Sequence, residues 1–242
     1  MNCPSPIYKT IKIFIALLSL FSMAKSFGAE KDLYDFLWLD PDKKVYVLQN
    51  KVHKKEKSVY VNLGVGLGLS SNFQDTNLIH SNAGYNISED WAIELLYTKY
   101  SNKDNDALTN LSKINKTEPF IRKMKSNYGA IVKWSPFYGK VNTFNKIIYF
   151  DWTFGLGAGV LNTESNATTV ADTTHAKVYS AEKYNAVIGK TEFSVHLSKN
   201  LHLGIGILTN FYNAPGPTIS NQAGKSSLRN NIDSVLSIGV SF

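Results

Sequence analysis

The chain has 242 residues, a mean hydropathy of −0.17 and a formal net charge of +7, and 19% of its residues are charged. This composition excludes a helical protein with several membrane spans, because each span needs a run of about 20 apolar residues. The low charged fraction also argues against an intrinsically disordered chain. The single cysteine excludes both a disulfide scaffold and paired CxxC metal sites.

Residues 1–26 have the organisation of a secretory signal peptide. Two lysines precede the apolar run Ile13–Ala24, which is too short to span a bilayer as a helix. Small residues favour cleavage after Ala24 or after Ser26. Removal of this segment takes away three lysines and no acidic residue, so the net charge falls to about +4. Such a mild charge gives no reason to expect a nucleic-acid partner.

Residues 27–57 are predicted to form a periplasmic N-terminal segment. Leu33–Leu39 favours a short helix, with Asp32 as its N-cap and Pro41 at its end. The rest of the segment is basic and contains Lys43, Lys44, Lys51, Lys54, Lys55 and Lys57. One interpretation is a solvated tail. The other is a segment that contacts anionic lipid headgroups or plugs the lower lumen of the domain that follows.

From residue 58 to residue 242 the dominant hydrophobic period is two. In Val59–Leu69 every second residue is aliphatic, and the residues between are mostly small or polar. Eleven residues of this pattern match a tilted membrane-spanning strand, which needs about 9–11 residues. Seven further alternating runs follow: Ile79–Ile87, Trp91–Tyr97, Tyr128–Trp134, Ile148–Val160, Thr191–Leu197, Leu201–Phe211 and Ile232–Phe242.

Eight runs predict an all-β fold, an eight-stranded antiparallel up-and-down transmembrane β-barrel. Closure is required because every backbone N–H and C=O group in lipid needs a partner. Short connections alternate with long ones, which places both ends of the barrel on the periplasmic side. The short connections are 88–90, 135–145 and 198–200, and the long ones are 102–126, 162–182 and 213–227. The first long connection is predicted to be partly helical around Leu108, Leu111 and Ile114.

The connection Ser198–Asn200 tests which face each residue takes. A three-residue loop there pairs Leu197 with Leu201 and His196 with His202, so that each pair shares a face. We expect Asn200 to adopt the left-handed conformation, which Asn tolerates.

Aromatic side chains fall near the ends of the alternating runs, where membrane-interface rings are expected. These residues are Tyr85, Trp91, Tyr97, Tyr128, Trp134 and Phe242. The last strand ends in Phe242, which is similar to the terminal signal that barrel-assembly machinery reads in outer-membrane barrels. The expected partners are therefore outer-membrane lipids and this machinery.

Two stretches carry a resemblance to a known family. Val45–Val52 leads into the first strand, and Trp134–Lys140 continues through Phe150 and Asp151 to Gly155–Gly159. Over residues 43–242 the chain resembles the outer membrane beta-barrel domain family, small proteins of predatory and social delta-type proteobacteria. The resemblance implies an outer-membrane location and a barrel, and it implies no catalytic residues.

If the apolar face contacts lipid, a polar network faces the lumen: Glu94, Lys133, Asp151, Lys190, Glu192, His196 and His202. It is either a structural core of paired charges or a narrow ion path. The inward glycines leave space either for water or for larger side chains opposite. His196 and His202 alone make a weak metal site. A lipid-modifying enzyme would need His80 or His175 on the outer side.

The sequence therefore predicts an outer-membrane barrel with a structural or surface-interaction role, no cofactor, no metal site and no catalytic residues. A narrow, porin-like pore for ions or small solutes is the first alternative, and a lipid-modifying enzyme is the second. The predicted surface ligand has no signature in the sequence.

Overall fold

The computed structural model describes residues 52–115, 118–143, 146–170, 178–218 and 224–242. The predicted signal peptide, both of its cleavage sites and the predicted helix at Leu33–Leu39 lie outside the described residues. So does His175.

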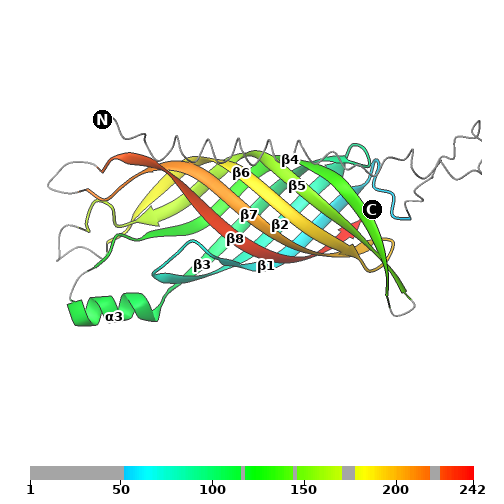
Figure 1. Ribbon diagram of the computed structural model, residues 1–242. Coiled ribbons are helices and arrows are strands. Elements are labelled where there is room, and N and C mark those ends of the chain that lie inside the picture. The colour runs from blue at the N-terminus through cyan, green and yellow to red at the C-terminus, as the bar shows by residue number, and fades with distance from the viewer. Residues whose placement is uncertain (1–51, 116–117, 144–145, 171–177, 219–223) are drawn as a thin grey trace, which may run out of the picture. The chain divides into compact units, whose positions relative to one another are not determined.

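Eight antiparallel strands form a closed barrel in which strands adjacent in sequence pair and β1 closes the ring on β8 (Figure 1). This confirms the predicted fold class. The strands are β1 (Val59–Gly68), β2 (Gln74–Asn86), β3 (Trp91–Asp104), β4 (Arg122–Thr143), β5 (Lys146–Ser165), β6 (Ser180–His196), β7 (Leu201–Pro215) and β8 (Ser226–Ser241).

A single helix, α3 (Asp106–Asn115), occupies the β3–β4 connection within the described residues and confirms the helical segment predicted there. It begins after Asn105, whose side-chain oxygen accepts a hydrogen bond from the Leu108 N–H at 3.0 Å and so caps the helix. No described helix is long and apolar enough to cross a membrane.

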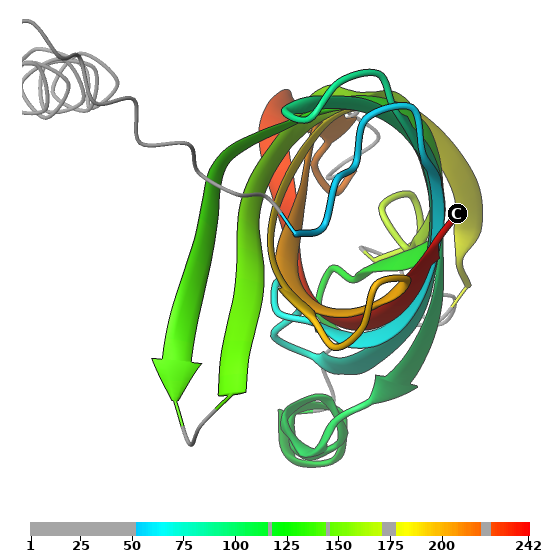
Figure 2. The ribbon, with the colours of Figure 1, turned by 90° about the vertical axis from the view of Figure 1, so that its right-hand side faces the viewer.

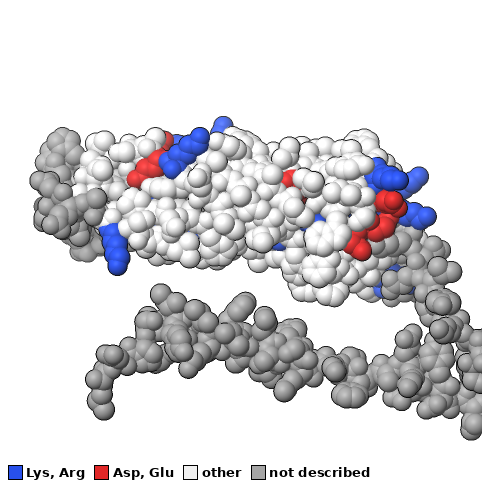
Figure 3. Space-filling view, turned by 90° about the horizontal axis from the view of Figure 1, so that it is seen from above, with Lys and Arg blue, Asp and Glu red and all other residues white. Residues whose placement is uncertain are grey.

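Period-two alternation in the sequence becomes two faces of one sheet. Along β2, buried and solvent-facing side chains alternate over the full length of the strand. The outward face is apolar, and on β1 the side chains of Val61, Leu63 and Val65 are 43–61% exposed. Figure 3 shows most of the charged side chains on one face near the two ends, with an uncharged belt between them. A continuous apolar belt around a closed barrel is the surface of a protein embedded in lipid.

The two ends of the barrel differ. At the short-turn end, β2 joins β3 through 87–90, β6 joins β7 through 197–200, and the chain enters β1 and ends at Phe242. At the long-loop end lie α3 and the longer connections (Figure 1). The backbone N–H of Phe242 donates to the carbonyl of Val59 at 2.8 Å, so the last residue continues the β1–β8 pairing.

The predicted short connection 135–145 is wrong in its extent. β4 continues to Thr143 and β5 starts at Lys146, and this hairpin extends beyond the rest of the barrel at the short-turn end (Figure 2). The register shifts between Trp134 and Phe137, where Pro136 has no N–H to give to the ladder. The bulge shifts the inward–outward alternation by one residue, so the alternating run predicted from the sequence ended at Trp134 although the strand continues.

The β6–β7 turn has the predicted pairing of His196 with His202. The predicted left-handed conformation of Asn200 is wrong, because Lys57 is the one non-glycine residue with positive φ among those described. The Ser198 hydroxyl instead accepts from the Leu201 N–H at 3.2 Å. Asn200 exchanges two hydrogen bonds with the Ser241 backbone, each at 2.8 Å, which hold the bend at 197–200 beside the end of β8.

Candidate functional site

Glycines on the inner wall make room for large side chains that cross the lumen. A Cβ atom at Gly84 would overlap the Tyr60 ring, and one at Gly204 would lie 2.5 Å from Oε1 of Glu192. At these two positions the space is filled by side chains, as the second interpretation of the inward glycines expects. At Gly66 the space is filled by the backbone carbonyl of Ser234.

Five side chains from four strands form the central charge cluster: Tyr60, Glu94, Lys133, Lys190 and Glu192. The Lys190 ammonium lies 2.7 Å from Oε1 of Glu94 and 2.8 Å from Oε2 of Glu192. Glu94 is fully buried, and its Oε2 also accepts a hydrogen bond from the Tyr60 hydroxyl at 2.7 Å. The Lys133 ammonium lies 3.6 Å from the same oxygen and 4.3 Å from the centre of the Tyr60 ring.

The central charge cluster is electrically balanced, with two carboxylates and two ammonium groups. Burying an isolated charge costs several kcal/mol, whereas paired and hydrogen-bonded charges are tolerated. Lys190 is the bridging member, because it contacts both carboxylates. The arrangement can hold β1, β3, β4 and β6 together across the lumen.

A second group, the short-turn-end cluster, consists of His53, Lys55, Asp151, His196 and His202. Oδ2 of Asp151 lies 2.7 Å from the Lys55 ammonium and 2.5 Å from Nε2 of His196. His53 stacks on His196 with 4.7 Å between ring centres. The His202 ring bonds instead to the amide oxygen of Asn62 at 2.8 Å.

The short-turn-end cluster attaches the last residues of the predicted N-terminal segment to the barrel. The backbone N–H groups of Lys55 and Glu56 donate to Oε1 of Glu89 at 3.2 and 3.1 Å. Loss of water around the His53 ring, together with charge repulsion from the neighbouring His196, lowers the pKa of His53 below 6.5. Lys55 reaches the lumen through its ion pair with Asp151, whereas residues 52, 54, 56 and 57 are exposed.

The structure therefore places the seven predicted network residues in two groups. Glu94, Lys133, Lys190 and Glu192 meet in the central charge cluster, whereas Asp151, His196 and His202 lie at the short-turn end. Sequence reasoning missed Tyr60 and Asn62, although both occupy the inward positions of the first alternating run. It also missed the hydrogen bond from the Tyr100 hydroxyl to Oδ2 of Asp233 at 2.6 Å, which joins β3 to β8.

An apolar layer also crosses the lumen. Leu96, Ile131, Ile188 and Leu208 are each at most 4% exposed and pack against one another. Two cavities beside the charged clusters have volumes of about 10 and 40 Å³. The smaller holds about one water molecule at most. Side chains fill this part of the interior.

All six predicted interface aromatics point outward and are 41–75% exposed. Trp91 and Trp134 pair at the short-turn end with 6.1 Å between ring centres. Tyr97 and Tyr128 are also direct partners, but both of their strands continue past them towards the long-loop end. The next outward residue of β3 is Lys99, so this tyrosine pair borders the apolar belt although it does not end its strands.

No group of three His, Cys, Asp or Glu side chains among the described residues is placed to hold a metal ion. His196 and His202 lie 6.1 Å apart between ring centres. His80, one candidate of the enzyme interpretation, is 1% exposed and bonds to the Thr98 hydroxyl at 2.8 Å. It faces the lumen and not the lipid.

No family model matches the chain, and no curated protein matches it. Among solved structures, the N-terminal β-barrel domain of Pseudomonas aeruginosa OprF aligns with a TM-score of 0.45 at 10% identity, covering 77% of this chain and 98% of that one. Neisserial surface protein A aligns with a TM-score of 0.43 at 16% identity, covering 76% and 94%. The outer membrane protein OprG of P. aeruginosa has a TM-score of 0.43 at 13% identity, covering 78% and 97%. The closed strand order establishes the fold independently of these similarities.

Proposed function

We propose that the mature chain is an outer-membrane β-barrel with a closed lumen, whose long-loop end interacts with the surroundings of the cell. Its role is structural and interactive, and no reaction is assigned to it. The lipid-facing belt and the closed ring of strands support a membrane location.

The closed lumen is inferred from the side chains that fill the barrel interior. Lys190 bridges two carboxylates across the barrel. In the apolar layer of Leu96, Ile131, Ile188 and Leu208, Ile131 is the cross-strand partner of Glu94 and Leu208 that of Lys190. A hydrated ion passing through would have to separate these pairs and cross the apolar layer, both of which are costly. At the short-turn end, Lys55 occupies the lumen beside Asp151.

The location and orientation are part of the same proposal. The predicted signal peptide supplies export, Phe242 is offered to the assembly machinery, and outer-membrane lipids surround the belt. Long connections of outer-membrane barrels face the outside, so α3 and its neighbouring connections face away from the cell. The resemblance to the delta-type proteobacterial barrel family supports this placement.

Planar-bilayer recording of the purified mature chain tests the closed lumen. We expect no stable conductance steps in concentrated KCl at high protein density, with a known porin recorded in the same bilayers to show that insertion is detected. Stable steps that disappear in Glu94→Ala or Lys133→Ala would replace the closed barrel with a narrow pore. Two measurements test the membrane location: cell fractionation, and slower migration of the heated protein than of the unheated protein on a gel.

A further inference from the structure

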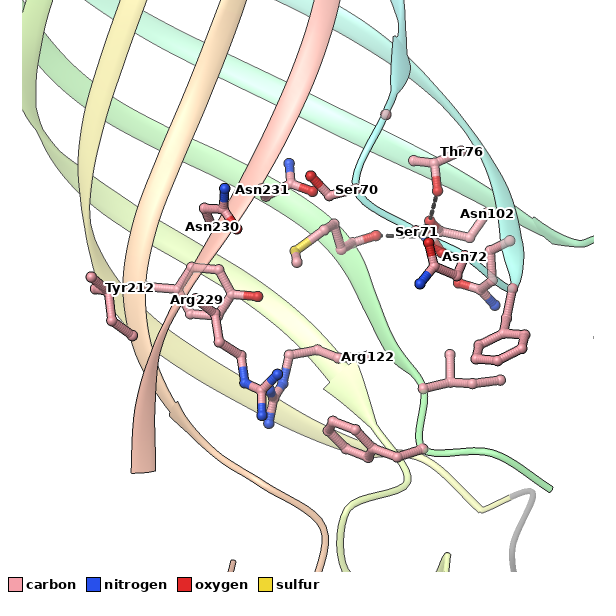
Figure 4. A pocket seen from close by; sticks show the side chains of 17 residues that line it. Ser70, Ser71, Asn72, Thr76, Asn102, Arg122, Tyr212, Arg229, Asn230 and Asn231 are labelled. Carbon is pink, nitrogen blue, oxygen red and sulfur yellow. Dashed lines mark hydrogen bonds between the residues drawn. The ribbon is translucent and has the colours of Figure 1, made fainter. Parts of the chain in front are cut away.

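The complete chain contains only two arginines, Arg122 and Arg229, among 26 basic residues. They lie on β4 and β8, more than one hundred positions apart in the sequence, yet both line one cavity at the long-loop end (Figure 4). We call this cavity the mouth cavity. Its volume is about 400 Å³.

One aromatic ring positions both guanidinium groups. The guanidinium carbon of Arg122 lies 5.1 Å from the centre of the Phe120 ring, and that of Arg229 lies 5.8 Å from the same centre. Arg122 also donates to Oε2 of Glu182 at 3.0 Å and to the Pro215 carbonyl at 2.9 Å. Two like charges are thus held against one ring, with one carboxylate to offset them.

Each arginine retains an unused donor. Arg122 is 95% buried, with 5% of its side chain exposed, yet its Nη1 atom has no hydrogen-bond partner among the described residues. The Nε atom of Arg229 is likewise buried and unpaired there. Buried polar groups of native proteins are nearly always hydrogen-bonded, and each exception calls for an explanation. Both side chains line the mouth cavity, so an acceptor bound there is one explanation for the two atoms.

The lining of the mouth cavity favours an anion. Of its 17 lining residues, the two arginines are the only charged ones, and no acidic residue is among them. Hydroxyl and amide groups line the side of the cavity opposite the arginines, and those of Ser70, Ser71, Asn72 and Asn230 can donate further hydrogen bonds (Figure 4). Guanidinium groups match phosphate and carboxylate oxygens in geometry as well as in charge.

We propose that the mouth cavity binds a small oxyanion, the phosphate or carboxylate group of a water-borne solute, between Arg122 and Arg229. A solute is favoured over a lipid headgroup because the cavity is lined from inside the barrel wall, while the membrane contacts the outside. The site goes beyond the closed-barrel function and does not depend on it.

The test follows the arginine Nε–H signals of the ¹⁵N-labelled full mature chain in detergent micelles during titration with inorganic phosphate. Only two such signals exist, so each reports on the site directly. We expect both to shift along a saturable curve, whereas KCl at matched ionic strength leaves them in place. If phosphate produces no saturable shift beyond that of KCl, the oxyanion site is refuted.

Two variants separate a built site from a general electrostatic attraction. We expect Arg229→Gln to weaken phosphate binding about tenfold or more, read on the Arg122 signal, because a charged hydrogen-bond donor is lost. Lys225→Gln removes the same charge at the same end from an exposed residue outside the cavity lining, and we expect less than about a twofold change.

Equal weakening by both variants would overturn the proposal. A difference in gel migration between the unheated and the heated protein shows that each variant is folded. Conductance of the wild-type barrel would contradict the closed lumen and leave phosphate binding unaffected, so the two proposals fail separately.

Discussion

Removal of the bridging ammonium by Lys190→Met should be the most costly single change in the lumen. The Lys190 side chain is 8% exposed and lies within 2.8 Å of two carboxylates. Without it, the Ser237 hydroxyl at 3.4 Å is the remaining hydrogen-bond partner of Glu192, and Lys133 is not in direct contact with this carboxylate, while Glu94 keeps Tyr60 and Lys133. The variant therefore leaves the buried Glu192 carboxylate without a directly contacting cation.

The size of the effect follows from the burial of these groups. Removing one partner of a buried ion pair costs about 3–5 kcal/mol, and Glu94 and Glu192 are 0% and 3% exposed. The double variant Lys190→Met with Glu192→Gln removes the stranded charge as well. It should recover about 2 kcal/mol or more relative to the single variant, because Glu94 and Lys133 remain as a balanced pair.

Urea titration of the protein refolded in detergent micelles, followed by tryptophan fluorescence, measures the free energy of unfolding. The matched control is Lys125→Met, which breaks a 3.3 Å ion pair with Glu164 in which the two side chains are 50% and 35% exposed. That change should cost about 0–1 kcal/mol. A loss below about 1 kcal/mol for Lys190→Met, or a double variant no more stable than the single one, would refute the reasoning.

Three further predictions concern the short-turn end and the inner wall. Lys55→Ala, which breaks a buried ion pair, should speed trypsin cleavage within residues 52–57 several-fold, while the exposed neighbour Lys54→Ala should slow cleavage or leave it unchanged. The pKa of His53 is lowered in the folded state, so the unfolded chain binds more protons as the pH falls through about 6.5 and the folded segment loses stability. The trypsin sensitivity of this segment should therefore rise from pH 7 to pH 5, and it should rise less in His53→Gln. Identical pH profiles for the two proteins would contradict this. Gly84→Val overlaps the tyrosine ring opposite and should cost about 1–3 kcal/mol in the urea titration, whereas the lipid-facing Ala83→Val should be near neutral.

The faces of the strands could be predicted from the sequence because alternation is a local property. Each of the seven predicted network residues points inward, since an inward residue is identified by its neighbours alone. The contacts across the lumen could not be predicted in this way. Lys190 and Glu94 are 96 positions apart, and their heights in the barrel depend on the register of every strand between them.

Two kinds of error came from treating the end of alternation as the end of a strand. At Trp134 a bulge interrupts the period while the strand continues. At the long-loop end the strands extend past the apolar belt, where outward residues are polar and no longer contrast with inward ones. Arg122 and Arg229 lie in such extensions, so the mouth cavity had no signature in the sequence.

A closed barrel that crosses a bilayer must hold its apolar belt in lipid. The mature chain has no cysteine once the predicted signal peptide is removed, so single spin labels can be placed at outward positions of the chain in lipid vesicles. We expect labels at Val61, Leu63 and Val65 to be accessible to oxygen and shielded from a water-soluble nickel complex, and a label at Lys103 to show the reverse. Equal access of the nickel complex to all four positions would contradict this expectation.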